Sequence, residues 1–391
     1  MNICFSVCEY DPFHNGHAYH VSQMKNSGAD FTVVIMSGSF TQRGEIAILD
    51  KYTRASHAIM AGADMVIELP TAFATSNAEI FASGAVKLIN ALGGGTLCFG
   101  SEQGTSEEFL KLAKISLNET DEFKKALKAE LEKGLPFAVA NVKAIEKTYS
   151  GVSTELLNSP NSVLGLEYVK AILRQNANVE IMPIKRVGAG FKDNNFEDKF
   201  CSASAIRGAI SQLNREKAKS FVPDFVYKDL PNSLLDISET VIYSILQKSE
   251  KDLKKVLDCT EGLENRFKQC AKSAKSFAEL IDLMETKRYT RARLSRIALQ
   301  NALNITEDKI RNLLKSGAYI KVLAIKKEKT ELLSILSNKI DKRTTSLITR
   351  KSDVDKLKGA KKVGFCIDEF ALSVYNLVSG KNLNAYDMKI I

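Results

Sequence analysis

Three of the four histidines in this 391-residue chain, His14, His17 and His20, lie within one short segment near the N-terminus. His14 and His17 are separated by Asn-Gly and follow the apolar run Ile3–Cys8, where a first strand should pass into a first helix. Free N–H groups and the helix dipole make a helix N-terminus attractive to phosphate. Imidazole groups would add side-chain donors at the same place. The segment therefore predicts a site for a nucleoside triphosphate.

A plainer interpretation of the same residues is a turn whose histidines cap the following helix. The pattern is short and recurs by chance in unrelated sequences. The position of the segment favours phosphate binding over simple capping, because the segment closes the first expected strand and opens an amphipathic helix over about Gly16–Met24. The two interpretations are kept as alternatives.

A second polar segment, Cys201-Ser-Ala-Ser-Ala-Ile-Arg207, precedes a short expected helix. It places Ser202, Ser204 and Arg207 at the helix N-terminus. Because an arginine fork matches phosphate oxygens, the segment predicts a second clamp on the same triphosphate. The alternative is ordinary serine capping followed by a surface arginine.

Two segments that follow expected strands should lie at the carboxyl edge of the sheet: the loop after the second strand and the residues after the fifth. The loop over residues 36–45 carries Gln42 and Arg43, which we expect to reach a small anionic substrate, with a plain surface loop as the alternative. Arg186 follows the fifth expected strand and should meet the nucleotide.

A basic segment in the second half of the chain is typical of nucleic-acid contact. Its cationic residues are Lys287, Arg288, Arg291, Arg293 and Arg296, interleaved with Tyr289. On a helix, Leu294 and Ile297 would face a core while Arg293 and Arg296 project together. Arginines beside a tyrosine suit RNA phosphates and unstacked bases. A solvated helix face is the alternative.

The net charge of +9 is unevenly distributed along the chain. Residues 1–220 hold 23 Lys and Arg against 24 Asp and Glu, whereas the remainder holds 32 against 22. A neutral first part joined to a basic second part indicates that one does chemistry and the other binds a polyanion.

The composition is that of an ordinary globular protein, with 45% hydrophobic and 26% charged residues. No apolar run approaches the roughly 20 residues of a membrane helix, and we expect no membrane partner. The N-terminus lacks the pattern of a signal peptide. Seven scattered cysteines without a Cys-x-x-Cys pair indicate buried thiols in a reducing cytosol, and no metal-ligating set is visible. We therefore expect a cytoplasmic protein.

Alternation of apolar strands and amphipathic helices predicts an α/β fold with a doubly wound parallel sheet. The expected strands are Ile3–Cys8, Phe31–Met36, Asp64–Leu69, Thr96–Phe99 and Val179–Ile184. Asp50 should cap a helix that stops at Gly62, and Ser76 with Glu79 should form a capping box for the next. The pattern of residues 104–150 predicts a charged helical insertion.

A change in pattern places a boundary near residue 220. A Pro-containing stretch over residues 221–231 precedes mostly helical segments, two possible strands (Tyr319–Ile325 and Thr344–Thr349) and a closing helix from Asp368 to Val378. We expect a catalytic domain over residues 1–220 and a mainly helical, basic C-terminal region over residues 221–391.

Taken together, these motifs resemble those of the bacterial tRNA(Met) cytidine acetate ligases, members of the nucleotidyltransferase superfamily marked by His-x-Gly-His. The resemblance is carried by Glu9-Tyr-Asp-Pro-Phe-His-Asn-Gly-His17, Met36-Ser-Gly, Gln42-Arg-Gly44, Phe99-Gly-Ser-Glu102, Ser159-Pro-Asn161, Gly188-Ala-Gly190, Ser202-x-Ser-x-Ile-Arg207 and Lys287-Arg-Tyr-Thr-Arg291. It extends over nearly the whole chain. Asp11, Ser39 and Thr41 depart from the family pattern, and the last two put fine contacts of the substrate loop in doubt.

The resemblance implies a Rossmann-like sheet of the HUP type and a two-step reaction. Acetate attacks the α-phosphate of ATP, giving acetyl-adenylate and pyrophosphate, and the wobble cytidine of elongator tRNA(Met) then takes the acetyl group, giving N4-acetylcytidine and AMP. It implies catalytic roles for His14, His17, Ser204 and Arg207, with Mg2+ as a helper. It implies ATP contacts from Val7, Cys8, Glu9, Tyr10, Asp11, Pro12, Phe13, His14, Asn15, Gly16, His17, Ala18, Tyr19, His20, Gly100, Asn161, Arg186 and Ser202. The five basic residues of the 287–296 segment become candidates for tRNA binding.

Two other functions stay open on the sequence. One is an adenylyltransferase acting on a small metabolite, against which the basic second half argues. The other is a non-catalytic RNA-binding protein with a relic nucleotide pocket, against which the intact set of His14, His17 and Arg207 argues.

Overall fold

The computed structural model describes residues 2–150, 152, 154–186, 201–286 and 288–391. Its centre is a parallel sheet of the five expected strands: β1 (Ile3–Cys8), β2 (Phe31–Ser37), β3 (Met65–Leu69), β4 (Gly95–Ser101) and β5 (Val179–Lys185). Their order is β5-β4-β1-β2-β3, so the winding direction reverses between β1 and β4. In a doubly wound sheet the ligand crevice opens at this reversal, beyond the carboxyl ends of the strands.

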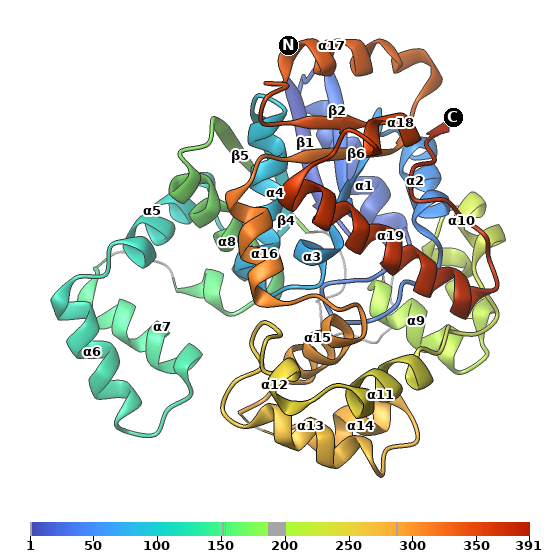
Figure 1. The fold of residues 1–391 in the computed structure, drawn as a ribbon. Helices are drawn as coiled ribbons and strands as arrows, with labels where there is room; N and C mark the ends of the chain where they lie inside the picture. The colour runs from blue at the N-terminus through green and yellow to red at the C-terminus, as the bar shows by residue number, and fades with distance from the viewer. Residues whose placement is uncertain (1, 151, 153, 187–200, 287) are drawn as a thin grey trace.

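Three strands from the last part of the chain extend the same sheet. β6 (Tyr319–Ile325) pairs antiparallel with β3, and β7 (Ser346–Ile348) and β8 (Lys389–Ile390) pair parallel with β6. Figure 1 shows the C-terminal strands lying beside the N-terminal ones. Residues from beyond the expected boundary at residue 220 therefore complete the sheet that residues from the first part begin.

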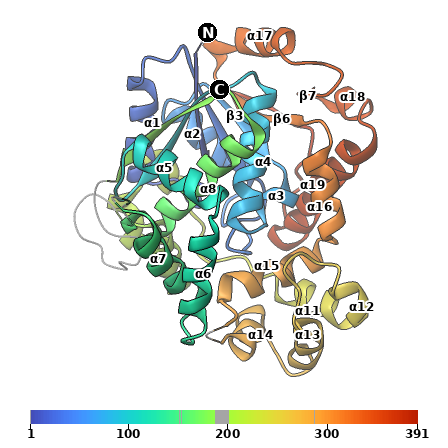
Figure 2. The same cartoon turned by 90° about the vertical axis from the view of Figure 1, so that its left-hand side faces the viewer.

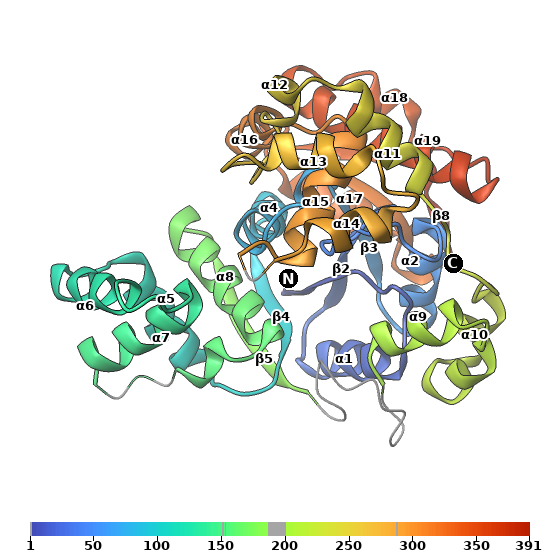
Figure 3. The same cartoon turned by 90° about the horizontal axis from the view of Figure 1, so that it is seen from below.

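Helices cover both faces of the sheet (Figure 3). On one face lie α1 (Asn15–Asn26) and α2 (Lys51–Met60), and on the other α4 (Ala78–Ala91) and α8 (Pro160–Gln175). The alternation of side chains along the strands fixes these faces. Cys4 and Cys98 pack with Met24 of α1, whereas the ring of Phe99 lies 5.9 Å from that of Tyr168 in α8.

The helix caps were predicted partly correctly. Asp50 caps α2 by accepting hydrogen bonds from the N–H groups of Tyr52 and Thr53, as expected. The cap of α4 is Asn77, which accepts from the N–H of Ile80. Ser76 instead donates to Ala72 in the short helix α3 (Thr71–Ala74), so the expected Ser76–Glu79 capping box is wrong.

The charged insertion forms three helices, α5 (Ser106–Leu117), α6 (Asp121–Leu131) and α7 (Phe137–Thr148). They project to one side of the molecule as an arm (Figures 1 and 2). A short 3-10 turn, η1 (Glu155–Leu157), leads from the arm into α8. The three helices agree with those expected between residues 104 and 150.

The second half of the chain is mainly helical, as expected. Its helices after α9 (Ala203–Ser211) are α10 (Asp224–Asp229), α11 (Ser238–Gln247), α12 (Glu250–Leu253), α13 (Leu263–Ala271), α14 (Phe277–Met284), α15 (Arg291–Ala302), α16 (Glu307–Lys315), α17 (Glu331–Lys339), α18 (Lys351–Val354) and α19 (Gly359–Ser379), with 3-10 turns η2 (Arg215–Phe221) and η3 (Lys327–Lys329). Helices α11–α15 form a layer on the side of the sheet's carboxyl ends (Figure 1). The closing helix begins at Gly359 rather than at Asp368. Within the described residues, no helix has both the length and the apolar character needed to cross a membrane.

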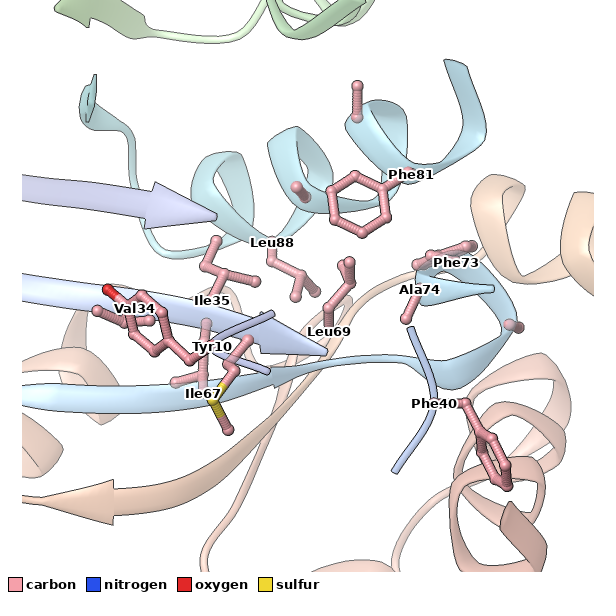
Figure 4. Packing of buried hydrophobic residues seen from close by; sticks show 14 of the residues in the cluster. Tyr10, Val34, Ile35, Phe40, Ile67, Leu69, Phe73, Ala74, Phe81 and Leu88 are labelled. Carbon is pink, nitrogen blue, oxygen red and sulfur yellow. The ribbon is translucent and has the colours of Figure 1, made fainter. Parts of the chain in front are cut away.

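One continuous apolar core joins the two halves of the chain, with members from Ile3 to Ala385. Figure 4 shows Phe73 and Phe81 packed beside Leu69 at the carboxyl end of β3. Gly84 permits this packing, because a Cβ atom there would come within 2.4 Å of the Phe73 ring.

A buried polar cluster also joins the halves. Lys51 of α2 and Glu68 of β3 form an ion pair at 2.8 Å, with both side chains almost fully buried. Beside them, the Tyr319 hydroxyl of β6 donates to Asp368 of α19 at 2.6 Å. Burial raises the pKa of Asp368 to about 7, with the nearby Glu68 adding to the shift. The C-terminal strand and helix are thus held to β3 by polar as well as apolar contacts.

Candidate functional site

A cavity of about 470 Å3 opens at the carboxyl edge of the sheet, where the strand order reverses. Among the predicted site residues, its lining includes Val7, Cys8, Glu9, Tyr10, Asp11, His14, Gly16, His17, Tyr19, His20, Gln42, Arg43, Gly100, Asn161, Arg186, Ser202, Ser204 and Arg207. Four residues of the predicted ATP segment, Pro12, Phe13, Asn15 and Ala18, do not line it. Motifs that are up to 200 residues apart in the sequence therefore meet in one place.

His14 and His17 form a reciprocal cap at the start of α1. The Nδ1 atom of His14 accepts a hydrogen bond from the N–H of Gly16 at 3.1 Å, and the Nδ1 atom of His17 accepts from the N–H of His14 at 3.3 Å. A neutral imidazole that accepts at Nδ1 carries its proton at Nε2. Both Nε2–H groups therefore stay available as donors, and the two rings stack with centroids 3.6 Å apart.

Burial keeps the three clustered histidines neutral. It lowers the pKa of His14 to about 3 and that of His20 to about 4, with the positive charge of Arg186 adding to both shifts. The pKa of His17 is also lowered, by burial first and then by repulsion from His14, Arg186 and His20. At neutral pH the site therefore offers uncharged N–H donors rather than imidazolium ions. A bound polyanion would shift these pKa values back upward.

The second predicted clamp opens helix α9 on the other side of the cavity. Ser202 caps the helix by accepting from the N–H of Ala205 at 3.1 Å. The guanidinium of Arg207 donates to the backbone oxygen of Asp11 at 2.6 Å and lies 3.5 Å from the carboxylate of Glu45. Two helix N-termini thus point at one cavity, with an arginine tied to the histidine loop between them. This is a suitable arrangement for a chain of phosphates.

A polar network occupies the edge formed by β4, β5 and α8. The Nδ2 of Asn161 donates to Glu102 at 2.5 Å, and Ser159 donates to the same carboxylate at 2.7 Å. Burial alone would raise the pKa of Glu102, but these hydrogen bonds bring it below the ordinary value. Arg186 lies 3.8 Å from Glu102, so it is placed at the rim of the cavity beside Gly100.

The loop after β2 is held from two directions. Buried Arg54 of α2 donates to the backbone oxygens of Ser37 and Gly38, and to that of Glu9 at 2.6 Å. On the outer side, Gly44 lies against α15 with φ +78°, and a Cβ atom there would come within 2.5 Å of the backbone nitrogen of Arg296. Gln42 and Arg43 therefore reach the cavity from a firmly positioned loop.

The basic segment packs against the protein more closely than expected. Arg296 is half-buried and donates to the backbone oxygen of Gln42 at 3.2 Å, and Arg293 donates to that of Asp258 at 2.8 Å. The expectation that these two side chains project together into solvent is wrong, because both find backbone carbonyl partners. Arg288 and Arg291 are exposed and form ion pairs with Glu261 and Asp282. Lys287 and the Gly188–Gly190 motif lie outside the described residues.

The cavity has an apolar side that the sequence did not indicate. Ala78 and Phe81 of α4, Phe99 of β4, and Val163, Leu164 and Tyr168 of α8 line it, together with Ser6, Pro160, Ile184, Lys185 and Ala203 elsewhere. The helical residues follow the ordinary spacing of core positions, so nothing in the pattern marked them as cavity residues. Among the described residues, no group of three or more His, Cys, Asp or Glu side chains is placed to hold a metal ion.

Comparisons with known proteins match almost the whole length of the chain. Residues 1–389 match the model of the HIGH Nucleotidyl Transferase family. The chain is 36% identical over 388 residues to the tRNA(Met) cytidine acetate ligase of Caldanaerobacter subterraneus subsp. tengcongensis, covering 96% of each protein. It is 40% identical over 345 residues to that of Caldicellulosiruptor saccharolyticus, covering 85% of this chain and 84% of the relative.

Two solved structures share the fold along the whole chain. Thermotoga maritima TmcAL bound with alpha-thio ATP has a TM-score of 0.87 at 28% identity, and the apo form of the same protein has a TM-score of 0.90 at 29% identity. Each covers 100% of both chains. With its histidine, serine and arginine motifs meeting in one cavity, this chain belongs to the HIGH nucleotidyl transferase family and, within it, to the tRNA(Met) cytidine acetate ligases.

Proposed function

We propose that the protein is an ATP-dependent ligase that acetylates the wobble cytidine of elongator tRNA(Met). The observation that supports this most directly is the meeting of two helix N-termini, α1 with its paired histidines and α9 with Arg207, in one cavity at the switch point of the sheet. The likeness to a structure bound with alpha-thio ATP supports the same ligand. We include in the proposal a cytoplasmic location, where tRNA is found.

In the first step, acetate attacks the α-phosphate of ATP and pyrophosphate leaves. Transfer at phosphorus depends on positioning and charge stabilisation more than on a protein nucleophile. The Nε2–H groups of His14 and His17 donate to the phosphate oxygens as negative charge moves toward pyrophosphate. Ser204 and Arg207 hold the far end of the triphosphate, and Asn161 and Arg186 face the nucleoside.

Magnesium enters this scheme with the substrate, as the ion that accompanies ATP. Mg2+ is commonly held by phosphates and waters with only one or two carboxylates. The Oδ2 atom of Asp11 is buried and has no hydrogen-bond partner among the described residues, so it offers one such oxygen beside the two clamps. Neutralising phosphate charge is the chemistry that the ion would supply.

In the second step, the exocyclic amine of cytidine attacks the acetyl group and AMP leaves. The proposed tRNA surface consists of the 287–296 segment, of which Arg288 and Arg291 are the exposed arginines. Because Arg296 touches the backbone of Gln42, this segment adjoins the wall of the cavity in the same chain. An anticodon bound there can therefore reach the cavity of its own chain.

The experiment that tests the function measures transfer of labelled acetate into total tRNA. The proposal is supported if incorporation requires ATP, if the label enters one tRNA species, and if it is recovered as N4-acetylcytidine. Exchange of pyrophosphate into ATP without acetate would instead indicate a small-metabolite adenylyltransferase, and tRNA binding with no turnover would indicate a relic site.

A further inference from the structure

The turn that ends helix α9 presents an apolar side chain on a strained backbone. Leu213 has a φ of +57°, in the left-handed region, and it is 77% exposed. Its N–H donates to the backbone oxygen of Ile210, and the N–H of Asn214 donates to that of Ala209, each at 2.9 Å. These two hydrogen bonds define a Schellman motif. Its left-handed position is usually glycine, because a β-carbon there crowds the following carbonyl oxygen.

Packing within the protein does not explain why a leucine occupies this position. Two other helices end in the same backbone conformation, α8 at Asn176 and α19 at Gly380, and both use a residue type that tolerates it. A leucine that is mostly exposed gains little from burial, so burial does not offset the strain. Strained positions of this kind are concentrated at functional sites. Leu213 therefore indicates a surface that meets an apolar group of a ligand.

A basic segment follows Leu213 directly. The turn η2 carries Arg215, Lys217 and Lys219 against a single carboxylate, that of Glu216. Arg215 donates to backbone oxygens near the end of α10, and Glu216 accepts from the hydroxyl of Tyr227 at 2.5 Å. Both lysines are exposed, and the side chain of Lys217 forms no hydrogen bond or ion pair with any described residue. The ammonium of Lys219 lies 5.7 Å from the centre of the Tyr227 ring.

Leu213, Lys217 and Lys219 together form what is here called the α9–η2 surface, and this surface adjoins the histidine loop. Asn15 stands between the two histidines of the motif, at the first position of α1. Its Nδ2 donates to the backbone oxygen of Ser220 at 3.0 Å. Because Asn15 does not line the cavity, this hydrogen bond joins η2 to the outer side of the same loop. The α9–η2 surface is therefore a direct continuation of the cavity wall.

The length of α9 gives the distance from this surface to the cavity. The helix has 9 residues, which at about 1.5 Å per residue span about 14 Å. Its first turn lines the cavity, and Leu213 follows its last turn. A span of about 14 Å is the rise of about four stacked nucleotides at about 3.4 Å each. A nucleotide bound in the cavity would therefore have near neighbours within reach of Leu213.

The α9–η2 surface and the basic segment of α15 lie on different sides of the cavity. Figure 3 shows α9 and α10 beside α1, with α14 and α15 across the carboxyl ends of the strands. Arg296 touches the backbone of Gln42 on one wall, whereas Asn15 touches that of Ser220 on the other. A nucleic-acid loop that places one base in the cavity would thus have protein on both sides.

We propose that the α9–η2 surface binds the anticodon loop beside the wobble cytidine, with Leu213 against the face of an unstacked base and the two lysines on phosphates. This inference rests on the proposed function. RNA offers both parts of the match, since its bases have apolar faces and its backbone is anionic. Leucine is among the side chains that insert against bases in nucleic-acid complexes. A lipid surface would instead call for a broad apolar helix face, and this surface has one leucine.

The Leu213→Gly variant tests the apolar contact without endangering the fold. Glycine adopts a φ of +57° freely, so the urea midpoint should not fall below that of the wild type. The Kd for elongator tRNA(Met), measured by filter binding at fixed salt, should rise about 10-fold, as for one lost base contact. Acetate-dependent ATP–pyrophosphate exchange without tRNA should be unchanged. Met60→Ala is the matched control, because Met60 is 52% exposed at the end of α2 that points away from the cavity.

A double variant, Lys217→Ala with Lys219→Ala, tests the phosphate contacts. Each contact to a single-stranded phosphate contributes about 0.7 to the slope of log Kd against log salt, so the slope should fall by about 1.4. Lys342→Ala with Lys358→Ala is the control, since these lysines are exposed beside α17 and α19. That pair should leave the slope unchanged.

Three results would overturn the inference. The first is wild-type tRNA binding in both α9–η2 variants. The second is a loss of exchange that accompanies the loss of binding, which would make the surface part of the ATP site. The third is binding to phosphatidylglycerol vesicles that Leu213→Gly abolishes while tRNA binding stays intact. Failure of the proposed function would look different, because the wild type itself would then show no acetate-dependent exchange and no acetylated tRNA.

Discussion

Each of the two histidines at the start of α1 has two nitrogen atoms, and under the proposed function these have separate tasks. The Nδ1 atoms of His14 and His17 cap the helix, and the Nε2–H groups are left for the ligand. Capping and phosphate binding, which were alternatives on the sequence, are therefore compatible in one residue. The cap also fixes the tautomer, so the site is prepared to donate before ATP arrives.

A pair of substitutions at His14 should separate these two tasks. Asparagine places an acceptor near the position of Nδ1 but has no group at Nε2, so His14→Asn should keep the stability of the wild type. His14→Ala should lower the free energy of unfolding by about 1 kcal/mol, the usual cost of a lost cap. Both should reduce acetate-dependent ATP–pyrophosphate exchange by roughly 100-fold or more, as for a lost transition-state donor. Urea unfolding and exchange assays check this, and exchange preserved in His14→Asn would contradict the donor role.

Stability should also depend on pH through these histidines. An unfolded histidine takes up a proton near pH 6.5, whereas folded His20 does so only near pH 4. Between these values the unfolded chain binds more protons, so the free energy of unfolding falls as the pH is lowered. His20→Gln should reduce the loss between pH 7 and pH 5 by about 2 kcal/mol. Urea titrations at the two pH values measure it, and an unchanged difference would show that His20 titrates normally.

At the scale of elements, the β2 loop and α15 form one unit although some 250 residues separate them. Gly44 lies against the backbone of Ser295 and Arg296, and Arg296 donates to Gln42. The loop that reaches the cavity is thus positioned by the helix that carries the basic segment. Local sequence could not reveal this, because the spacing of Arg293 and Arg296 is the same for a solvated face and for a packed one.

The Gly44→Ala variant should disturb this unit. The added Cβ atom meets backbone, which cannot move aside as a flexible side chain would, so the loop must shift away from α15. We expect kcat/KM for acetate to fall by roughly 10- to 100-fold, since small displacements of positioning groups have effects of that size. Gly134→Ala is the matched control, with φ +76° and no atom within 4 Å of the added Cβ. It should cost about 1 kcal/mol of stability and leave activity unchanged.

Much of the element level could be predicted from the sequence, for identifiable reasons. Apolar runs such as Phe31–Met36 mark buried strands, and Asp50 marks a helix start, because both signals are local. The role of Phe81 and Tyr168 could not be predicted, since a residue that lines a cavity and one that fills a core have the same helical spacing. The pairing of β6 with β3 was also missed, because the apolar pattern of a strand gives no sign of which distant strand it pairs with.

At the scale of the whole molecule, the two parts of the chain share one sheet and one apolar core, with the cavity at the carboxyl edge of the sheet. β6 covers the edge of β3, and the ion pair of Lys51 with Glu68 lies close enough to the Tyr319–Asp368 hydrogen bond for their charges to affect Asp368. The neutral first part and the basic second part differ in charge but share a core. We therefore connect the difference in charge between the two parts with the ligands that each is proposed to bind, and not with a division into independent domains.

A fragment that ends at residue 220 should not fold by itself. It would leave β3 with an unpaired apolar edge and Lys51 and Glu68 uncovered, and such edges promote aggregation. We expect no cooperative urea transition by circular dichroism and poor dispersion in amide NMR spectra. The full-length chain serves as control. A cooperative transition in the fragment would restore the boundary at residue 220.

The pairing of β3 with β6 has a consequence for synthesis on the ribosome. β6 emerges about 250 residues after β3. At about 5 to 20 residues per second, the apolar edge of β3 waits roughly 12 to 50 s for its partner. During that time the nascent chain contains both histidines of the site, and from residue 204 onward both serines, but it lacks β6. Until β6 arrives, the edge of β3 is therefore open to pairing with another chain.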